Sequence, residues 1–333
     1  MLPGPSLNGA AYTSAEIFAE EERAIFRTHW ICVGRDDEVA LPGQWLRETI
    51  ASAPVLVVRG ADLELRAFHD VCRHRGASLV GRKDCGRSAR LVCPYHGWTY
   101  ELDGRGKEAS LLAVGCATWA GFVFVNLAGG TLETHDAPPW LAGLGPLVRA
   151  RRTVAMVRAS WKLLAQNFQE SHHFPGIHPA LEALTPTAEA RTWTNEGRWL
   201  GGMMAIRGET VSRDGKRHGR PRITDRDDVH DALFFPLLLT SLQPDYLLSY
   251  RLYPESADTT RIVADIHVHP AGAAHDWTPV FEFWDQVNAE DRAICEDQQA
   301  NARSPGFQLV GYTSVEEGVA AFDRLVTRST LPR

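Results

Sequence analysis

The chain has 333 residues, of which 44% are hydrophobic and 23% are charged. This composition is typical of a folded globular protein with room for two packed cores, and it excludes a disordered or fibrous chain. The formal net charge is −6, from 35 basic and 41 acidic side chains, and the absence of a long basic run argues against nucleic-acid binding.

The sequence gives no sign of a membrane segment. The most apolar stretch, residues 232–242, is about half as long as the ~20 residues that span a bilayer, and Pro236 interrupts it. The N-terminal residues lack the basic and apolar regions of a signal peptide. We therefore expect a cytoplasmic protein.

The first 137 residues predict a short helical segment followed by strands. Residues 14–30 have apolar side chains at helical spacing, and Ser14 is a suitable N-cap. Short strand patterns separated by turn residues come next, at residues 55–59, 64–69, 91–92, 98–102 and 121–126. We expect an N-terminal helical segment at residues 1–30 and an all-β domain at 31–137.

The remainder of the chain predicts a second domain, at residues 138–333. It begins with a Pro/Gly-rich connection, and a helix at 162–173 should end at Pro175 and Gly176. Strands are expected at residues 154–161, 190–194, 200–207, 246–252 and 261–269, and further helices at 277–303 and 314–327. This order predicts an α+β domain built on an antiparallel sheet.

Two short Cys/His pairs indicate a metal site in the β domain. Eighteen residues separate the first pair from the second. In a Rieske centre two cysteines bind one iron and two histidines bind the other. Zinc sites of the Cys₂His₂ type usually present both cysteines first, whereas here the order alternates; zinc and coincidence remain alternatives. The pattern predicts a [2Fe–2S] Rieske cluster held by Cys72, His74, Cys93 and His96.

A second group of candidate ligands begins near the end of the predicted helix 162–173. Two histidines and one carboxylate form the facial triad of non-haem Fe(II) oxygenases, which leaves coordination positions open for O₂. Glu170 and His173 are three residues apart, so they should share a helix face, and His172 should point elsewhere. The alternative is that His173 and His178 are structural histidines beside a helix end.

Both motifs resemble those of Rieske non-haem iron oxygenase α subunits. The first resemblance covers residues 72–77 and 93–98, and the second is the pattern Asn-x-x-acid-x-x-His-x-x-x-x-His, matched by Asn167, Glu170, His173 and His178. The resemblance implies that His173 and His178 bind a mononuclear Fe(II). It also implies that Glu170 links His173 to a cluster histidine, His96, of a neighbouring subunit in a homotrimer.

The third iron ligand should be a carboxylate from the predicted helix 277–303. Residues 290–296 resemble the region that supplies this ligand in the choline, carnitine and betaine branch of the family, and the matching position is Asp291. Glu290 and Glu296 are the rival ligands. The branch usually has glycine where this chain has Asn301, which weakens the match to that branch.

The resemblance implies a helix-grip (START-like) catalytic domain and a terminal oxygenase. An NAD(P)H-dependent reductase or a ferredoxin would pass electrons through the cluster to Fe(II), where O₂ is activated. The substrate would be a small organic molecule that is hydroxylated or N/O-dealkylated, and a quaternary ammonium compound is the first candidate. The alternatives are mono- or dioxygenation of an aromatic ring, and an electron carrier fused to a ligand-binding module.

Aromatic side chains of the second domain are candidates for the substrate pocket, because aromatic rings bind quaternary ammonium groups. The alternative is that these rings belong to the core and the sheet. The candidates are Trp193, Trp199, Phe235, Tyr246 and Tyr250.

Overall fold

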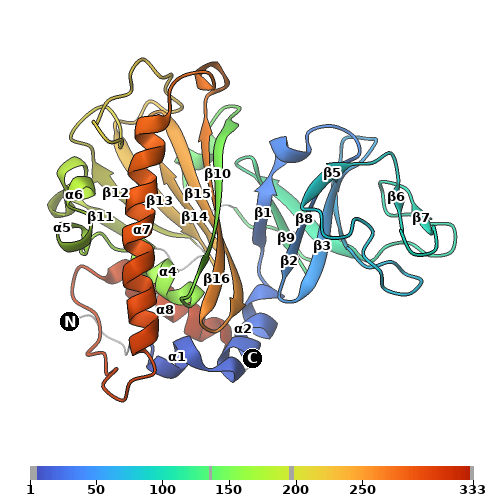
Figure 1. Cartoon of the computed structure of the whole chain (residues 1–333), viewed down its shortest axis with the longest axis horizontal. Helices are drawn as coiled ribbons and strands as arrows, with labels where there is room; N and C mark the ends of the chain where they lie inside the picture. Colours follow the sequence, from blue (N-terminus) through green and yellow to red (C-terminus); the bar gives the residue numbers. More distant parts are fainter. Residues whose placement is uncertain (1–5, 135–136, 195–198, 331–333) are drawn as a thin grey trace. The chain divides into compact units, whose positions relative to one another are not determined.

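The computed structural model describes residues 6–134, 137–194 and 199–330. The chain forms two compact units, one of residues 22–135 and the other of residues 1–21 with 136–333. Each unit has its own seven-stranded sheet (Figure 1). The predicted class is confirmed, since an all-β N-terminal domain is followed by a domain of helices on an antiparallel sheet. In the described residues no helix is both long and apolar enough to cross a membrane.

The sheet of the β unit has the strand order β1-β9-β8-β4-β3-β2-β5, and β6 and β7 form a separate pair. Its strands are β1 (Ile31–Arg35), β2 (Gln44–Ile50), β3 (Ala53–Arg59), β4 (Leu65–His69), β5 (Cys85–Arg87), β6 (Leu91–Val92), β7 (Thr99–Tyr100), β8 (Ala113–Trp119) and β9 (Phe122–Asn126). The five predicted strands are present. The prediction missed β1, β2, β5 and β8; β1 is buried at every residue, so it shows no polar/apolar alternation.

The sheet of the second unit is antiparallel throughout, with the order β10-β16-β15-β14-β13-β12-β11. Its strands are β10 (Val148–Val157), β11 (Arg191–Thr194), β12 (Trp199–Ala205), β13 (Asp228–Phe234), β14 (Leu238–Leu242), β15 (Tyr246–Ser256) and β16 (Thr259–Val268). The apolar stretch 232–242 is the end of β13, a turn and all of β14. It is apolar because these strands are central and almost wholly buried.

Helix α7 (Thr278–Asn301) runs across one face of this sheet (Figure 1). It packs through Val280, Phe283, Trp284 and Val287, the i, i+3, i+4, i+7 spacing of an apolar helix face. Two predicted helices are therefore present, α7 and α8 (Glu317–Thr330). The short helices of this unit are α1 (Gly9–Thr13), α2 (Ala15–Glu21), α3 (Pro139–Ala142), α4 (Trp161–Phe168), α5 (Phe174–Ile177) and α6 (Pro179–Leu184). This unit also has 3₁₀ turns at Thr187–Glu189 and Pro270–Gly272, and the β unit has a 3₁₀ turn at Asp36–Val39.

Two helix predictions need correction. The helix expected at 14–30 is α2 followed by a π-helical turn that ends at Phe26, because Thr28 and His29 bond through their side chains to carbonyls of the last turn. The helix expected at 162–173 ends at Phe168. Pro175 begins the next helix, α5, instead of ending the previous one, since proline is tolerated in a first helical turn.

A buried ion pair fixes the start of α4, the helix that precedes the site. Lys162 Nζ donates to Glu21, and both side chains are 1% exposed. Trp161 Nε1 donates to the other carboxylate oxygen of Glu21, at 2.9 Å. Burial lowers the pKa of Lys162, and the charge of Glu21 opposes that shift. Each group of this network therefore depends on its partners.

We expect Glu21→Ala to destabilise the second unit by about 3–5 kcal/mol, because it leaves a buried ammonium without a partner. Differential scanning calorimetry would show this as a lower unfolding temperature. The matched control is Glu282→Ala, which removes an exposed partner of Arg213 and should change stability by less than about 1 kcal/mol. Equal effects of the two substitutions would show that the Glu21–Lys162 pair is not a stabilising contact.

Candidate metal centres

The two Cys/His pairs lie in two loops with the same backbone geometry. In each loop the cysteine N–H bonds to the carbonyl five residues later, and a glycine N–H four residues later bonds back to the cysteine carbonyl. These residues are Cys72, Gly76 and Ala77 in the first loop and Cys93, Gly97 and Trp98 in the second. The two glycines have φ values of 76° and 72°, which only glycine adopts without strain. The loops are therefore built as a matched pair.

The cysteines point into the core and the histidines lie at the surface. Cys72 and Cys93 are 2% and 3% exposed, whereas His74 and His96 are exposed, with ring centroids 4.7 Å apart. Burial opposes ionisation of Cys72, but hydrogen bonds from the Tyr100 hydroxyl and from loop amides give a net lowering of its pKa. Thiolate is the form of cysteine that binds metal.

This arrangement fits a [2Fe–2S] cluster better than one zinc ion. Zinc–ligand bonds of about 2.0–2.3 Å would bring all four ligand atoms close together. Among the described residues, the only group of three or more His, Cys, Asp or Glu with ligand atoms within 4.8 Å of one another is elsewhere, and it contains no residue of these loops. A [2Fe–2S] cluster would be held by the buried cysteines on one iron and by the exposed histidines on the other, so the four ligand atoms need not meet at one ion.

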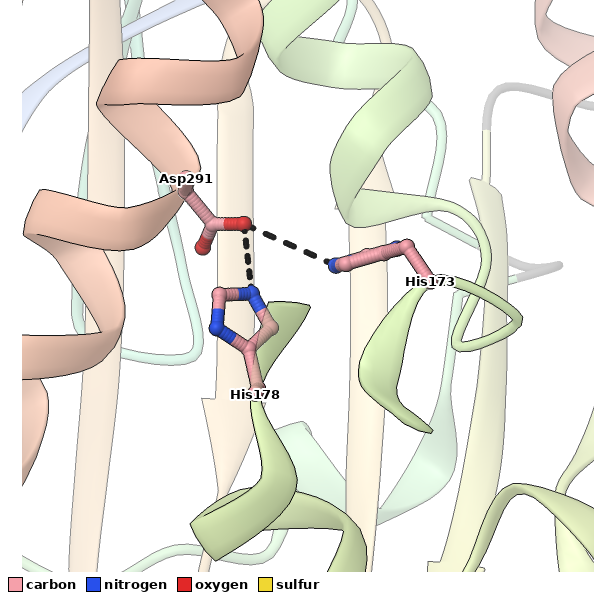
Figure 2. A group of neighbouring side chains, drawn as sticks. All are labelled: His173, His178 and Asp291. Carbon is pink, nitrogen blue, oxygen red and sulfur yellow. Dashed lines mark hydrogen bonds and ion pairs between the residues drawn. The ribbon is translucent and has the colours of Figure 1, made fainter. Parts of the chain in front are cut away.

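That closely spaced group is His173, His178 and Asp291. Both imidazoles point at the same carboxylate of α7 (Figure 2). Asp291 Oδ1 lies 2.8 Å from Nε2 of His178 and 3.5 Å from Nε2 of His173. Two imidazole nitrogens and one carboxylate oxygen that converge on one point form the donor set of a non-haem Fe(II) site.

The two histidines come from turns and not from a helix face. His173 follows α4 in the turn before α5, and His178 lies between α5 and α6, where its N–H bonds to the carbonyl of Phe174. The predicted helical i, i+3 relation of Glu170 and His173 is therefore wrong. Their proximity comes from the turn, in which Glu170 Oε2 accepts hydrogen bonds from the N–H groups of His172 and His173.

Each imidazole of the group has a second carboxylate behind it. Nδ1 of His173 is 2.7 Å from Glu170 Oε1, and Nδ1 of His178 is 2.7 Å from Glu290 Oε2. A carboxylate on the far nitrogen fixes the tautomer and leaves Nε2 free for a metal. The rival ligand Glu290 thus lies behind His178, and the other rival, Glu296, pairs with Arg158. Sequence alone could not assign Glu290 this position, since it is adjacent to Asp291.

The charges of the group favour a bound cation. Burial disfavours the charged form of His173, but Asp291 and Glu170 outweigh it and raise its pKa to about 9. The pKa of His178 is raised for the same reason, against burial, by Asp291 and Glu290. Burial raises the pKa of Asp291, yet its bonds to both imidazoles produce a net lowering. A divalent cation can replace the protons that these carboxylates hold on the imidazoles.

The three residues open into a cavity of about 170 Å³ between the sheet, α7 and the α4–α6 segment. Most of its wall is apolar, and the aromatic rings on it are Phe168, Phe174, Tyr250 and Trp284. Tyr250 donates a hydrogen bond to Asn288 Oδ1, at 2.8 Å, one turn of α7 before the aspartate. Of the aromatic residues expected in the pocket, Tyr250 lines this cavity.

The other expected aromatics lie elsewhere, so the predicted pocket set needs correction. Trp193 packs against Trp140, and Phe235 packs against Trp161 and Phe322 in the core. Tyr246 is fully buried and donates its hydroxyl to the carbonyl of Val211. Trp199 packs against Phe234. Trp193 and Trp199 leave their strands on the face away from the cavity, and Phe235 lies in the turn between β13 and β14. Tyr246 shares a strand face with Tyr250 but lies beyond the cavity wall, against Trp284. Strand propensity does not reveal these differences.

Family models match most of the chain. Residues 29–116 match the Rieske [2Fe-2S] domain, and residues 144–330 match the ring hydroxylating alpha subunit (catalytic domain). The chain is 30% identical to the glycine betaine monooxygenase oxygenase subunit of Chromohalobacter salexigens, over 95% of this chain and 84% of that protein. It is 26% identical to the carnitine monooxygenase oxygenase subunit of Acinetobacter baumannii, over 95% and 92%.

Solved structures agree on the fold. A quaternary ammonium Rieske monooxygenase superposes with a TM-score of 0.85 at 24% identity, covering 98% of this chain and 96% of that one. Naphthalene 1,2-dioxygenase from Rhodococcus sp. superposes with a TM-score of 0.80 at 15% identity, covering 97% and 94%. The family models and the relative at 30% identity confirm the family inferred from the sequence. The chain belongs to the Rieske non-haem iron oxygenases, as an oxygenase α subunit with a Rieske [2Fe–2S] domain and a catalytic domain that contains the His-His-Asp group.

Proposed function

We propose that this subunit is the terminal oxygenase of a monooxygenase that acts on a small quaternary ammonium compound. The observation that carries the proposal is the His-His-Asp group at the wall of an apolar cavity with four aromatic rings. Aromatic faces attract quaternary ammonium cations. Relatives that cover most of the chain are named as glycine betaine, carnitine and choline monooxygenases.

The proposal assigns ligands to both metal centres. Cys72, His74, Cys93 and His96 would hold the cluster, and His173, His178 and Asp291 would hold the mononuclear iron. The bound groups would supply electron storage and O₂ activation. His172 is exposed and would not be a ligand. The protein's own contribution is to fix the imidazoles through carboxylates and to keep the cavity apolar.

Glu170 is proposed to position His173 and to bridge it to His96 of a neighbouring subunit in a homotrimer. One carboxylate oxygen of Glu170 is hydrogen-bonded to His173 Nδ1, and the Glu170 side chain is 17% exposed. A carboxylate between two metal-bound imidazoles can accept an N–H from each. An oxygenase subunit of this kind works with a reductase, and we expect one that uses NAD(P)H directly or through a ferredoxin.

The iron-ligand assignment predicts that Asp291→Ala loses the mononuclear iron and keeps the cluster. Anaerobically purified protein should fall from about three to about two irons per chain, with two acid-labile sulfides in both cases. Glu296→Ala is the matched control, because Glu296 lies on the same helix and pairs with Arg158. Retention of the third iron and of turnover by Asp291→Ala would sink the assignment.

The positioning role of Glu170 predicts a different result for Glu170→Gln. The amide is isosteric, so both metal centres should remain, while turnover falls by about tenfold to a hundredfold because an imidazole loses its charged partner. Reduction of the cluster followed by its reoxidation under O₂ and substrate should slow in parallel. His172→Gln is the control in the same turn. Near-normal reoxidation in Glu170→Gln would refute the role.

Turnover tests the substrate class. With a reductase, NAD(P)H and O₂, we expect product from at least one of glycine betaine, carnitine and choline, measured by mass spectrometry and by coupled O₂ uptake. Naphthalene serves as the aromatic alternative, which the apolar cavity wall also favours. Product from naphthalene alone would replace the proposed substrate class with ring oxygenation. Cluster reduction without O₂ uptake on any substrate would favour the electron-carrier alternative.

A further inference from the structure

Asp231 places a carboxyl group on the wall of the cavity, away from the metal-binding group. It lies in the middle of β13, and the alternation of a strand puts Val229 and Asp231 on the face that lines the cavity. Its cross-strand neighbours are Gly202 on β12 and Ser241 on β14, which also line the cavity. Gly202 has no side chain that could cover or pair with the carboxyl.

Within the described residues this carboxyl group has no cationic partner. Ser241 lies cross-strand from it and lowers its pKa, and the Ser241 hydroxyl oxygen accepts a hydrogen bond from Gln243 Nε2 at 2.9 Å. Oδ1 of Asp231 has no hydrogen-bond partner and almost no contact with solvent, although the residue as a whole is only half-buried. The other buried aspartates of the sheet are paired: Asp245 with Arg220, and Asp265 with Arg152 and Arg251.

An unpaired carboxyl in an apolar wall is costly unless a ligand uses it. Burial raises the pKa of Asp231 to about 7, while the Ser241 hydrogen bond opposes that shift. A carboxyl group with this pKa populates both its neutral and its charged form near neutral pH. A positive charge nearby would stabilise the carboxylate and would itself be stabilised, because opposite charges attract strongly where water is excluded.

Tyr250 connects this carboxyl to the metal-binding group. Burial raises the pKa of Tyr250 well above its ordinary value, and the charges of Asp291 and Asp231 add to that shift. Tyr250 lines the same cavity on β15, two residues from Leu248, and Leu248 and Asp231 are both cross-strand neighbours of Ser241. A small cation in this cavity can therefore meet both the Asp231 carboxyl and the aromatic wall to which Tyr250 belongs.

We infer that Asp231 is the specificity-determining residue that neutralises the cationic centre of the substrate. The inference rests on the proposed function and deepens it, since it predicts that an uncharged molecule of the same shape binds more weakly. The remaining charged side chains on the cavity wall are the metal-binding group with Glu170, and two exposed arginines, Arg191 and Arg292. Asp231 is therefore the carboxylate of the wall that remains available to the substrate.

The test compares choline with its neutral carbon isostere, 3,3-dimethylbutan-1-ol, on the complete holoenzyme. Binding is measured by anaerobic titration calorimetry, without reductant. We expect wild type to prefer choline, and Asp231→Asn to lose about tenfold or more of its affinity for choline while its affinity for the isostere is unchanged. Asp228→Asn is the matched control: it removes the same charge from the same strand, but outside the cavity.

Asp231→Ala is the second variant, and the cluster spectrum and iron content show that each variant is folded. A preference for choline that survives both substitutions would overturn the role of Asp231 and leave the proposed substrate class intact, with the aromatic rings as its basis. Equal binding of choline and the isostere by wild type would overturn both the role of Asp231 and the quaternary ammonium proposal. Neither result would affect the assignment of the chain as a Rieske oxygenase subunit.

Discussion

The packing of α7 against the sheet is the constraint on which the catalytic site depends. Val280 and Phe283 bury one face of the helix in the core, and this fixes the rotation of the helix about its axis. Trp284, Asn288 and Asp291 follow at i, i+4 and i+7, and all three line the cavity. One helix face therefore supplies, in order, core, cavity wall and metal-binding carboxylate. A rotation of that face would move Asp291 away from both histidines.

The buried charges of the site explain why the fold suits a metal. Asp291, Glu170 and Glu290 lie around only two imidazoles. Like charges placed this close in a partly buried site repel one another and lose hydration. The carboxylates raise the pKa of both imidazoles against the effect of burial, which shows that the site favours positive charge. A divalent cation would offset the repulsion, so metal binding and stability of this region should be linked.

The cluster-binding loops follow a different principle. Their geometry is local, because each loop closes through hydrogen bonds between residues four or five positions apart. The cysteines are also tied to the core, where they pack with Leu91 and Tyr100. The histidines stay at the surface, which suits electron exchange with another protein or subunit. One chain thus combines a locally folded electron-accepting site with an oxygen-activating site assembled over more than a hundred residues.

The sequence by itself determined the parts of this protein that are local. The spacing of the two Cys/His pairs, the residues 170–178 motif and the order of strands and helices identified the family and the α+β class. The two long C-terminal helices, α7 and α8, were also predicted, whereas six strands, β1, β2, β5, β8, β13 and β14, were not. The predicted features depend on residues near one another along the chain, where spacing and turn chemistry suffice.

The tertiary structure decided which side chains of the site face one another. It put Glu290 behind His178 and Asp291 in front of it, although the two acids are adjacent in sequence. It ended α4 at Phe168 and so formed the Glu170–His173 contact through a turn. Of the aromatic residues expected in the pocket, it placed only Tyr250 on the cavity wall, together with Phe168, Phe174 and Trp284. It also placed Asp231 on that wall. Each outcome depends on which face of a strand or helix is buried, and that is set by packing between segments far apart in the chain.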